Sequence, residues 1–233
     1  GYRGYDCRNN LRYLASNEIV YPAAGLGIVY DRKQSQRFYD VHTDDVIGLA
    51  LHPQGKFVAT GEIGRKPKIL VWDSDNMKTL ATLVGFHKRG VPHLAFSNGN
   101  GDRIASVGLD NDYSIAVYAW AQGVMVASCK GTKNKVMGIC FGVSSSEIIT
   151  CGKNHVSFWA VKGSSLKSQR GLFGNKSRGR ARGGVKTAHS LTMMDCASFG
   201  NQSSSSKVLV TGFQDGTIGI WDGHKLSTCV NTM

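Results

Sequence analysis

The chain has 233 residues, a formal net charge of +12 and a sequence pI of about 9.6, and 41% of its residues are hydrophobic. The apolar fraction is sufficient for a packed core, but no run of about 18 apolar residues offers a membrane-spanning helix. The positive charge favours acidic partners, namely nucleic acid, acidic lipid or acidic protein surfaces. Because the chain starts at a glycine and lacks a charged-then-apolar signal segment, we expect it to be part of a longer protein.

The opening stretch, GYRGYDCRNNLRYL, fits neither a helical nor a strand pattern. Its aspartate, Asp6, can pair with a neighbouring arginine, which a buried arginine would require. Because large aromatic side chains need apolar surroundings, we predict a structural role for the segment rather than a binding role. The side chains that we expect to pack into the fold are Tyr2, Tyr5, Leu11 and Tyr13.

A short apolar run that ends in an aromatic residue recurs along the chain. The aromatic positions are Tyr30, Trp72, Tyr118, Trp159 and Trp221. The first three intervals, of 42, 46 and 41 residues, match the period of WD repeats, whereas the last, of 62, indicates an insertion. Each unit divides into four short strands separated by turn residues. The sequence therefore predicts an all-β fold, a WD-repeat β-propeller with about five repeat units.

Five units do not close a ring, because about seven blades need roughly 280 residues at this period. We therefore expect the propeller to be incomplete here. Residues 1–34 would form the packed opening motif. Residues 35–233 would form the WD-repeat blades, with a basic insertion at about 167–187.

Polar residues in these units resemble the buried His–Ser/Thr–Asp–Trp hydrogen-bond network of WD repeats, which implies that they satisfy one another behind the aromatic residue. In the last unit the network consists of His189, Thr211, Asp215 and Trp221. The other units keep only parts of it. The first WD unit has His42, Thr60 and Trp72 but no aspartate, the second has His87, Ser106 and Asp110 with Tyr118, and the third has Thr150 and Trp159. A catalytic role for His189 with Asp215 is the alternative, and the structural role is favoured.

Catalytic, cofactor-binding and metal-binding signatures are missing from the sequence. We find no P-loop, no G-x-S-x-G motif and no cysteine pair with zinc-ligand spacing among the six cysteines. We therefore expect no enzyme, no cofactor and no metal site. The cysteines are predicted to be reduced thiols of a cytoplasmic protein.

The insertion is a run of positive charge without a single acidic residue. Its candidate partner-binding residues are Lys167, Arg170, Lys176, Arg178, Arg180, Arg182 and Lys186. Two interpretations remain open. The insertion is either a solvated loop without a partner or an electrostatic arm that contacts an acidic surface.

The opening GYRGYDCRNNL, followed by EIVY, resembles the hydrophobic HELP motif that precedes the WD repeats of the echinoderm microtubule-associated protein-like family. The resemblance continues through SQRFYDVHTDDVIGLALHPQGKFVATGEIG, RGVPHLAFS, IITCGKNHVSFW and QRGLFG, and so covers most of the chain. The departures are Tyr118-Ala119 in place of Trp-Asp, the basic stretch NKSRGRARGGVK and a serine run at 203–206.

The resemblance implies that these blades are part of a larger tandem propeller, and that the protein is a non-enzymatic scaffold that binds tubulin or microtubules. It also implies a cytoplasmic, cytoskeletal location, on cytoplasmic microtubules or in the axoneme of a cilium, with other cytoskeletal or axonemal proteins as further partners and no membrane. The alternative is a generic adaptor propeller for other proteins or RNA, with microtubule binding elsewhere in the full chain. RNA comes into question because SRGRARGG is an arginine-glycine segment, although it lacks aromatic residues for base stacking.

Overall fold

The computed structural model describes residues 7–173, 193–199 and 208–231, the segment 193–199 by its backbone alone. These residues form β-strands, turns and a single turn of 3₁₀-helix, η1 (Trp120–Gln122). No helix among them is long and apolar enough to cross a bilayer. The chain divides into two compact units, an N-terminal unit (1–133) and a C-terminal unit (134–233).

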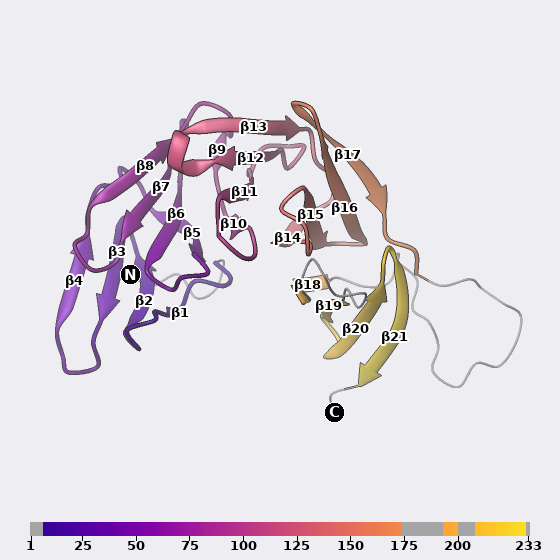
Figure 1. Ribbon diagram of the computed structural model, residues 1–233, viewed down its shortest axis with the longest axis horizontal. Coiled ribbons are helices and arrows are strands. Elements are labelled where there is room, and N and C mark those ends of the chain that lie inside the picture. The colour runs from indigo at the N-terminus through magenta and orange to yellow at the C-terminus, as the bar shows by residue number, and fades with distance from the viewer. Residues whose placement is uncertain (1–6, 174–192, 200–207, 232–233) are drawn as a thin grey trace, which may run out of the picture. The chain divides into compact units, whose positions relative to one another are not determined.

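The N-terminal unit contains three antiparallel four-stranded runs, in which each strand pairs with the next (Figure 1). Sheet 1 consists of β1 (Arg12–Tyr13), β2 (Ile19–Ala23), β3 (Leu26–Tyr30) and β4 (Gln36–Tyr39). Sheet 2 consists of β5 (Val46–Leu51), β6 (Phe57–Gly64), β7 (Ile69–Asp73) and β8 (Thr79–Leu83). Sheet 3 consists of β10 (His93–Phe96), β11 (Arg103–Val107), β12 (Ile115–Ala119) and β13 (Val124–Cys129). A two-residue strand, β9 (Arg89–Gly90), pairs with the end of β6.

The C-terminal unit repeats this arrangement twice. Sheet 4 consists of β14 (Val136–Phe141), β15 (Glu147–Gly152), β16 (His155–Lys162) and β17 (Ser165–Arg170). Sheet 5 consists of β18 (Met193–Phe199), β19 (Val208–Phe213), β20 (Thr217–Asp222) and β21 (Lys225–Asn231). The prediction of four-stranded antiparallel units is confirmed throughout.

Each aromatic residue of the sequence repeat lies on the third strand of its sheet. The three tryptophans Trp72, Trp159 and Trp221 are at most 5% exposed. In sheets 2, 3 and 5 the register between the third and fourth strands shifts immediately before the aromatic residue. A bulge bends and twists a strand, so its recurrence at the same place shows that the units are structural repeats.

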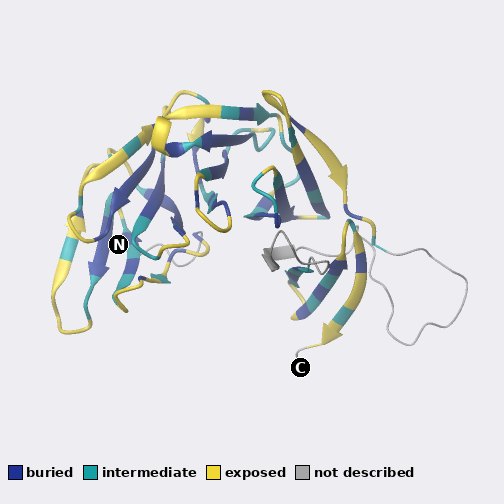
Figure 2. Ribbon diagram, in the orientation of Figure 1, coloured by how far each residue is buried: buried dark blue, intermediate teal, exposed yellow. Residues whose placement is uncertain are grey.

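Burial follows the strand order within each sheet. The second and third strands are largely buried, whereas the fourth strands β4, β8, β17 and β21 are largely exposed (Figure 2). Continuous apolar runs such as ILVWD on β7 are buried over their whole length. This pattern is expected of inner strands that pack against neighbouring sheets on both faces.

Sheet 1 joins the opening segment to sheet 2 through a shared core. The ring of Tyr39 stacks on Trp72, with centroids 4.6 Å apart and planes inclined by 7°. A side chain at Gly27 would place its Cβ 2.8 Å from Trp72 Cζ2, so only glycine permits this close packing. Leu14 and Val20 from the opening segment lie in the same cluster. The segment therefore belongs to the core of the N-terminal unit.

The opening motif is less buried than its sequence predicted. Tyr2 and Tyr5 lie outside the described residues. Leu11 and Tyr13 are 45% and 55% exposed, so the prediction that their side chains pack into the fold is wrong. The reason is that β1 has only two residues and pairs with β2 alone, so Tyr13 meets Arg32 rather than a second sheet.

Candidate functional site

A hydrogen-bond network lies behind the aromatic residue of sheet 2. Thr60 Oγ1 accepts a hydrogen bond from Trp72 Nε1 at 3.1 Å and contacts His42 Nε2 at 2.7 Å. His42 Nδ1 lies 2.9 Å from Glu62 Oε2. Glu62, which the sequence argument overlooked, therefore provides the carboxylate that this unit lacked. It stands two residues after Thr60 on the same strand, whereas the expected aspartate would follow by four.

Glu62 is 2% exposed and also organises the adjacent backbone. It accepts hydrogen bonds from Thr43 N at 3.1 Å and from Lys68 N at 3.2 Å. Burial opposes ionisation of Glu62, but the hydrogen bonds from His42 and Thr43 outweigh it and lower the pKa of Glu62. Burial also lowers the pKa of His42. The contact is therefore a hydrogen bond from a neutral imidazole to a carboxylate and not an ion pair.

Sheet 3 has the aspartate-containing network. His87 Nε2 lies 2.6 Å from Ser106 Oγ, and His87 Nδ1 lies 2.9 Å from Ser114 Oγ. Ser114 donates hydrogen bonds from its hydroxyl and its backbone N–H to Asp110. Burial lowers the pKa of His87 to about 4, so this histidine is neutral at physiological pH. Here the carboxylate sits in the turn between the second and third strands.

The networks of sheets 4 and 5 are described in part. Trp159 Nε1 donates to Thr150 Oγ1, and Trp221 Nε1 donates to Thr211 Oγ1, each at 2.9 Å. Asp215 is exposed and accepts a hydrogen bond from Thr217 Oγ1 at 2.7 Å. His189 lies outside the described residues, so the complete chain from His189 to Trp221 stays a prediction.

The predicted basic insertion is described only at its start. Lys167 and Arg170 are exposed residues of β17, and Arg170 Nη2 donates to the backbone oxygen of Asn154 at 3.4 Å. Two further lysines, Lys135 and Lys153, are exposed nearby. Lys153 precedes Asn154 in the chain, and its backbone N donates to the backbone oxygen of Lys135 at 2.9 Å. The remaining candidates lie outside the described residues, namely Lys176, Arg178, Arg180, Arg182 and Lys186.

The N-terminal unit carries a second set of exposed cations, which we call the basic edge: Arg65, Lys66, Lys88 and Arg89. Arg65 and Lys66 occupy the hairpin between β6 and β7, and Arg89 belongs to β9, which pairs with β6. Leu109 N donates to Gly90 O at 2.9 Å, and Arg89 Nη1 donates to Asn111 Oδ1 at 2.8 Å. Backbone pairing thus fixes both loops next to each other and next to the turn of sheet 3.

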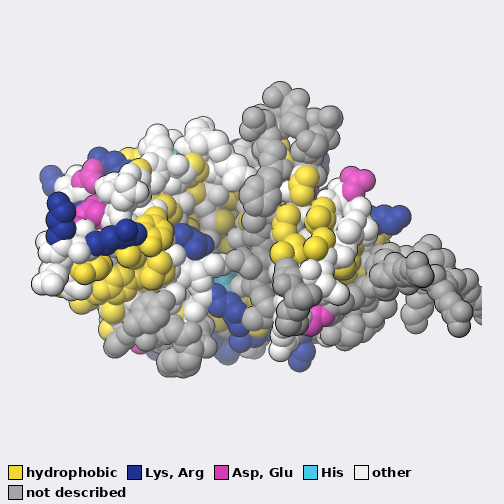
Figure 3. All heavy atoms as spheres, turned by 90° about the horizontal axis from the view of Figure 1, so that it is seen from below, with side chains coloured by type: hydrophobic (Ala, Val, Ile, Leu, Met, Phe, Trp, Pro, Cys, Tyr) yellow, Lys and Arg dark blue, Asp and Glu magenta, His cyan; other side chains and the backbone are white. Residues whose placement is uncertain are grey.

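The charges of the basic edge are largely uncompensated. Within the described part of the chain, none of its four members forms an ion pair. Figure 3 shows one face of the molecule, on which Lys and Arg side chains border an apolar area over the N-terminal unit. The sequence signal for this edge was only GRKPK and HKRG, two short basic stretches that a longer and denser basic run obscured.

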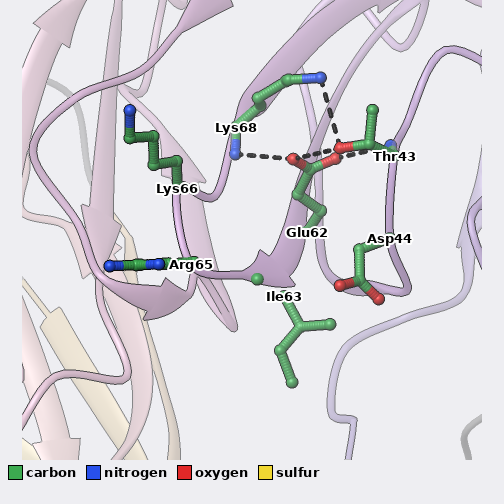
Figure 4. A pocket seen from close by; sticks show the side chains of 8 residues that line it. Thr43, Asp44, Glu62, Ile63, Arg65, Lys66 and Lys68 are labelled. Atoms are coloured by element: carbon green, nitrogen blue, oxygen red, sulfur yellow. Dashed lines mark hydrogen bonds between the residues drawn. The ribbon is translucent and has the colours of Figure 1, made fainter.

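Two pockets accompany the basic edge. The larger, of about 630 Å³, is lined by Thr43, Asp44, Glu62, Ile63, Gly64, Arg65, Lys66 and Lys68 (Figure 4). The second, of about 480 Å³, is lined by Phe86, Lys88, Arg89, Asp110, Asn111, Asp112, Ser114, Ser128, Cys129 and Lys130. Both volumes fall within the range of ligand sites, roughly 300–1,000 Å³. The described residues contain no group of histidine, cysteine, aspartate and glutamate side chains that could hold a metal ion.

Two family models match this chain. Residues 1–28 match the HELP motif, and residues 35–233 match the first β-propeller of echinoderm microtubule-associated protein. The latter match alone covers most of the chain.

Individual relatives agree with the family models. Human echinoderm microtubule-associated protein-like 1 is 34% identical, over 95% of this chain and 27% of its own length. Mouse echinoderm microtubule-associated protein-like 2 is 38% identical, over 74% of this chain and 28% of its own length. The 77 kDa echinoderm microtubule-associated protein of Strongylocentrotus purpuratus is 36% identical, over 74% of this chain and 27% of its own length. The chain thus spans about a quarter of the length of these relatives.

Solved structures support the fold alone, since their sequences are distant. A chain of the mitotic checkpoint complex matches with a TM-score of 0.63 at 20% identity, over 88% of this chain and 58% of that chain. The structure of U3-55K matches with a TM-score of 0.68 at 18% identity, over 98% of this chain and 66% of that chain. With the HELP motif, the propeller match and the repeated four-stranded sheets together, the chain belongs to the echinoderm microtubule-associated protein-like family.

Proposed function

We propose that this chain is a non-enzymatic scaffold that binds the acidic surface of tubulin or microtubules through its basic edge. The observation that carries the proposal is a set of exposed cations that form no ion pair with other described residues and lie on loops held in place by backbone pairing. Relatives of the same family are named as microtubule-associated proteins. A rigid platform with loop-borne contacts is the usual way in which a β-scaffold presents a binding surface.

The strength of such a surface depends on several cations acting together. A single exposed ion pair contributes about 0–1 kcal/mol, so the four members of the basic edge would give useful affinity only in concert. The guanidinium groups of Arg65 and Arg89 can contact a carboxylate through two parallel hydrogen bonds. Because the Debye length is about 8 Å at physiological ionic strength, binding should weaken as salt is added.

The basic insertion offers a second contact in this proposal. Lys167 and Arg170 lie exposed on β17, and Lys135 and Lys153 add two cations near the end of that strand. The segment from Lys176 to Lys186 follows in sequence and carries the rest of the predicted arm. We propose that the arm adds electrostatic affinity to contacts made by the sheets, on cytoplasmic or axonemal microtubules.

A microtubule co-sedimentation assay with the full-length protein tests the proposal. We expect binding that falls when NaCl is raised from 50 to 200 mM and that is unchanged by nuclease. Replacing Arg178, Arg180 and Arg182 by glutamine should weaken binding without a change in the thermal unfolding midpoint. Binding that nuclease abolishes would instead support the alternative of an RNA adaptor, and a protein that stays in the supernatant at both salt concentrations would contradict the proposal.

A further inference from the structure

Sheets 2 and 3 obtain the carboxylate of their networks from different places. In sheet 3 the carboxylate belongs to Asp110, within the turn, and it accepts the N–H of Ser114 at 2.8 Å. The carboxylate of this turn therefore accepts hydrogen bonds from within the turn itself. In sheet 2 the carboxylate belongs to Glu62, on strand β6. Of the following hairpin, Lys68 contacts this network, whereas Arg65 and Lys66 have no part in it.

Glu62 also closes the base of that hairpin. Its carboxylate accepts Lys68 N at 3.2 Å, and its own backbone N–H donates to Lys68 O at 3.1 Å. The hairpin is fastened on both flanks as well, because Ile63 N donates to Asp45 O at 2.8 Å and Ile63 pairs with Gly90 of β9. The loop that carries Arg65 and Lys66 is thus held in place from three sides.

The cations of the hairpin differ in whether their side chains contact the rest of the protein. The ammonium of Lys68 donates to Thr43 Oγ1 at 3.4 Å, which directs it back to the protein. Arg65 and Lys66 are exposed and extend on one side of the pocket, while Asp44 lies on the other and Glu62 between them (Figure 4). One wall of the pocket therefore offers hydrogen-bond donors that form no ion pair with any described residue. The opposite wall offers the carboxylate of Asp44, whose Oδ1 also accepts the Asp45 N–H at 2.8 Å.

We propose that this hairpin and its pocket bind an acidic polypeptide segment, and that Glu62 is the residue that positions the hairpin for this purpose. The proposal rests on the proposed function, because it names the chemistry that the basic edge would recognise. Side-chain carboxylates of the segment would pair with Arg65 and Lys66. Backbone N–H groups of the same segment would donate to Asp44.

The position of Asp44 favours a polypeptide over a nucleic acid. A polyphosphate backbone presents a dense row of negative charges, and a carboxylate on the facing wall repels it. An acidic peptide separates its charges and supplies backbone donors between them. The pocket, of about 630 Å³, has room for several side chains of such a segment.

The test is binding of a labelled peptide of alternating glutamate and serine residues to the full-length protein, measured by fluorescence anisotropy at 50 and 150 mM NaCl. The double variant Arg65→Gln/Lys66→Gln should bind roughly tenfold more weakly, since it loses two exposed contacts. It should also show a smaller dependence on salt.

The chain offers a matched control in Arg32→Gln/Lys33→Gln. These residues form the same Arg–Lys pair, are exposed, and lie in the same unit on the turn between β3 and β4. This variant should bind the peptide as the wild type does. Equal weakening in both variants would mean that only overall charge matters, and no weakening in the hairpin variant would place the peptide elsewhere; either result overturns the proposal.

The role of Glu62 is tested by two substitutions. Glu62→Ala should loosen the hairpin, so that the Lys68 amide exchanges faster with solvent and peptide affinity falls. Glu62→Gln retains one oxygen that can accept the Lys68 amide, but its NH2 group then faces the Thr43 N–H. It should therefore hold the hairpin, and bind the peptide, better than Glu62→Ala. Loss of binding in Glu62→Gln, or wild-type binding in a folded Glu62→Ala protein, would contradict the assignment.

The two proposals fail in different ways. Hairpin-dependent peptide binding without microtubule binding would remove the proposed function and leave the carboxylate site in place. Microtubule binding that is the same in wild type and Arg65→Gln/Lys66→Gln would leave the function and remove the site. Displacement of the peptide by single-stranded RNA at lower charge concentration than by unlabelled peptide would overturn the choice of a polypeptide.

Discussion

Sheets 2 and 3 of the N-terminal unit solve the same packing problem with different residues. Each buries an aromatic side chain behind a histidine and a hydroxyl, but sheet 2 completes the network with Glu62 from a strand and sheet 3 with Asp110 from a turn. The two sheets therefore differ in whether the turn after the second strand supplies the carboxylate of the network. The turn of sheet 3 is an internal part of the fold, whereas the hairpin of sheet 2 presents two cations to solvent.

The aromatic residues should reveal the largest difference between the two sheets. Trp72→Ala should lower the free energy of unfolding by about 3–5 kcal/mol, because it leaves a cavity beneath Tyr39 and removes the donor to Thr60. Tyr118→Ala should cost less, since the smaller ring leaves a smaller cavity. Chemical denaturation of both variants measures the two values, and a larger loss for Tyr118→Ala would reverse the comparison.

The two histidines should differ in their effect on acid stability. His87 takes up its proton near pH 6.5 in the unfolded chain but only near about pH 4 when folded, so the unfolded state binds more protons between these values. The free energy of unfolding should therefore fall on acidification from pH 6.5 to 4, by roughly 3 kcal/mol at most. Above pH 6.5 this contribution does not change.

Comparison of the pH slopes of the wild type, His87→Gln and His42→Gln isolates each contribution. The slope between pH 6.5 and 4 should flatten most in His87→Gln. It should flatten less in His42→Gln, because Glu62 partly opposes the lowering of the His42 pKa. Identical slopes in wild type and His87→Gln would show that this histidine is not held neutral.

The carboxylates themselves should differ by a smaller amount. Glu62→Ala leaves His42, the Thr43 amide and the Lys68 amide without their acceptor in a buried place, which should cost about 3 kcal/mol. Asp110→Ala affects a half-buried turn and should cost about 1–2 kcal/mol. Urea unfolding of the two variants side by side gives the difference, and equal losses would mean that strand and turn carboxylates are equivalent in stability.

The exposed cations should have almost no effect on stability. Arg65→Gln/Lys66→Gln should change the free energy of unfolding by less than about 0.5 kcal/mol, because surface substitutions away from special features rarely do more. Arg32→Gln/Lys33→Gln should cost no more than about 1 kcal/mol, because it also removes the contact of Arg32 with the ring of Tyr13. Thermal scans of both variants would check this. A midpoint lowered by several degrees in the hairpin variant alone would show that Arg65 or Lys66 supports the fold.

The fold could be predicted from sequence because its signal repeats. Apolar runs that end in Trp72, Trp159 and Trp221 recur at a near-constant interval, and strand pairing follows from their order. The role of Glu62 could not be predicted, because the expected aspartate follows the hydroxyl by four residues and the side chain that reaches His42 follows by two. Only the structure shows that Glu62 contacts His42 directly, whereas Asp110 is linked to His87 through Ser114.

The candidate site was harder to predict, because the sequence alone does not show which basic residues form ion pairs with acidic residues. The run from Lys167 to Lys186 dominates the basic residues, whereas the basic edge consists of two short pairs, 23 positions apart from Arg65 to Lys88. They meet because β9 pairs with the end of β6. The exposure of Leu11 and Tyr13 was missed for a related reason. The apolar side chains of a segment do not show whether a short edge strand, here of two residues, packs against a second sheet.

The account is tested most directly by carbodiimide cross-linking of the full-length protein to microtubules, followed by mass spectrometry. The reagent joins a lysine amine to a carboxylate in direct contact, so it reports which lysines face acidic residues of tubulin. The account predicts cross-links at Lys66 and Lys88, reduced at higher salt. Cross-links confined to Lys33, Lys56 and Lys78, on turns other than those of the basic edge, would contradict it.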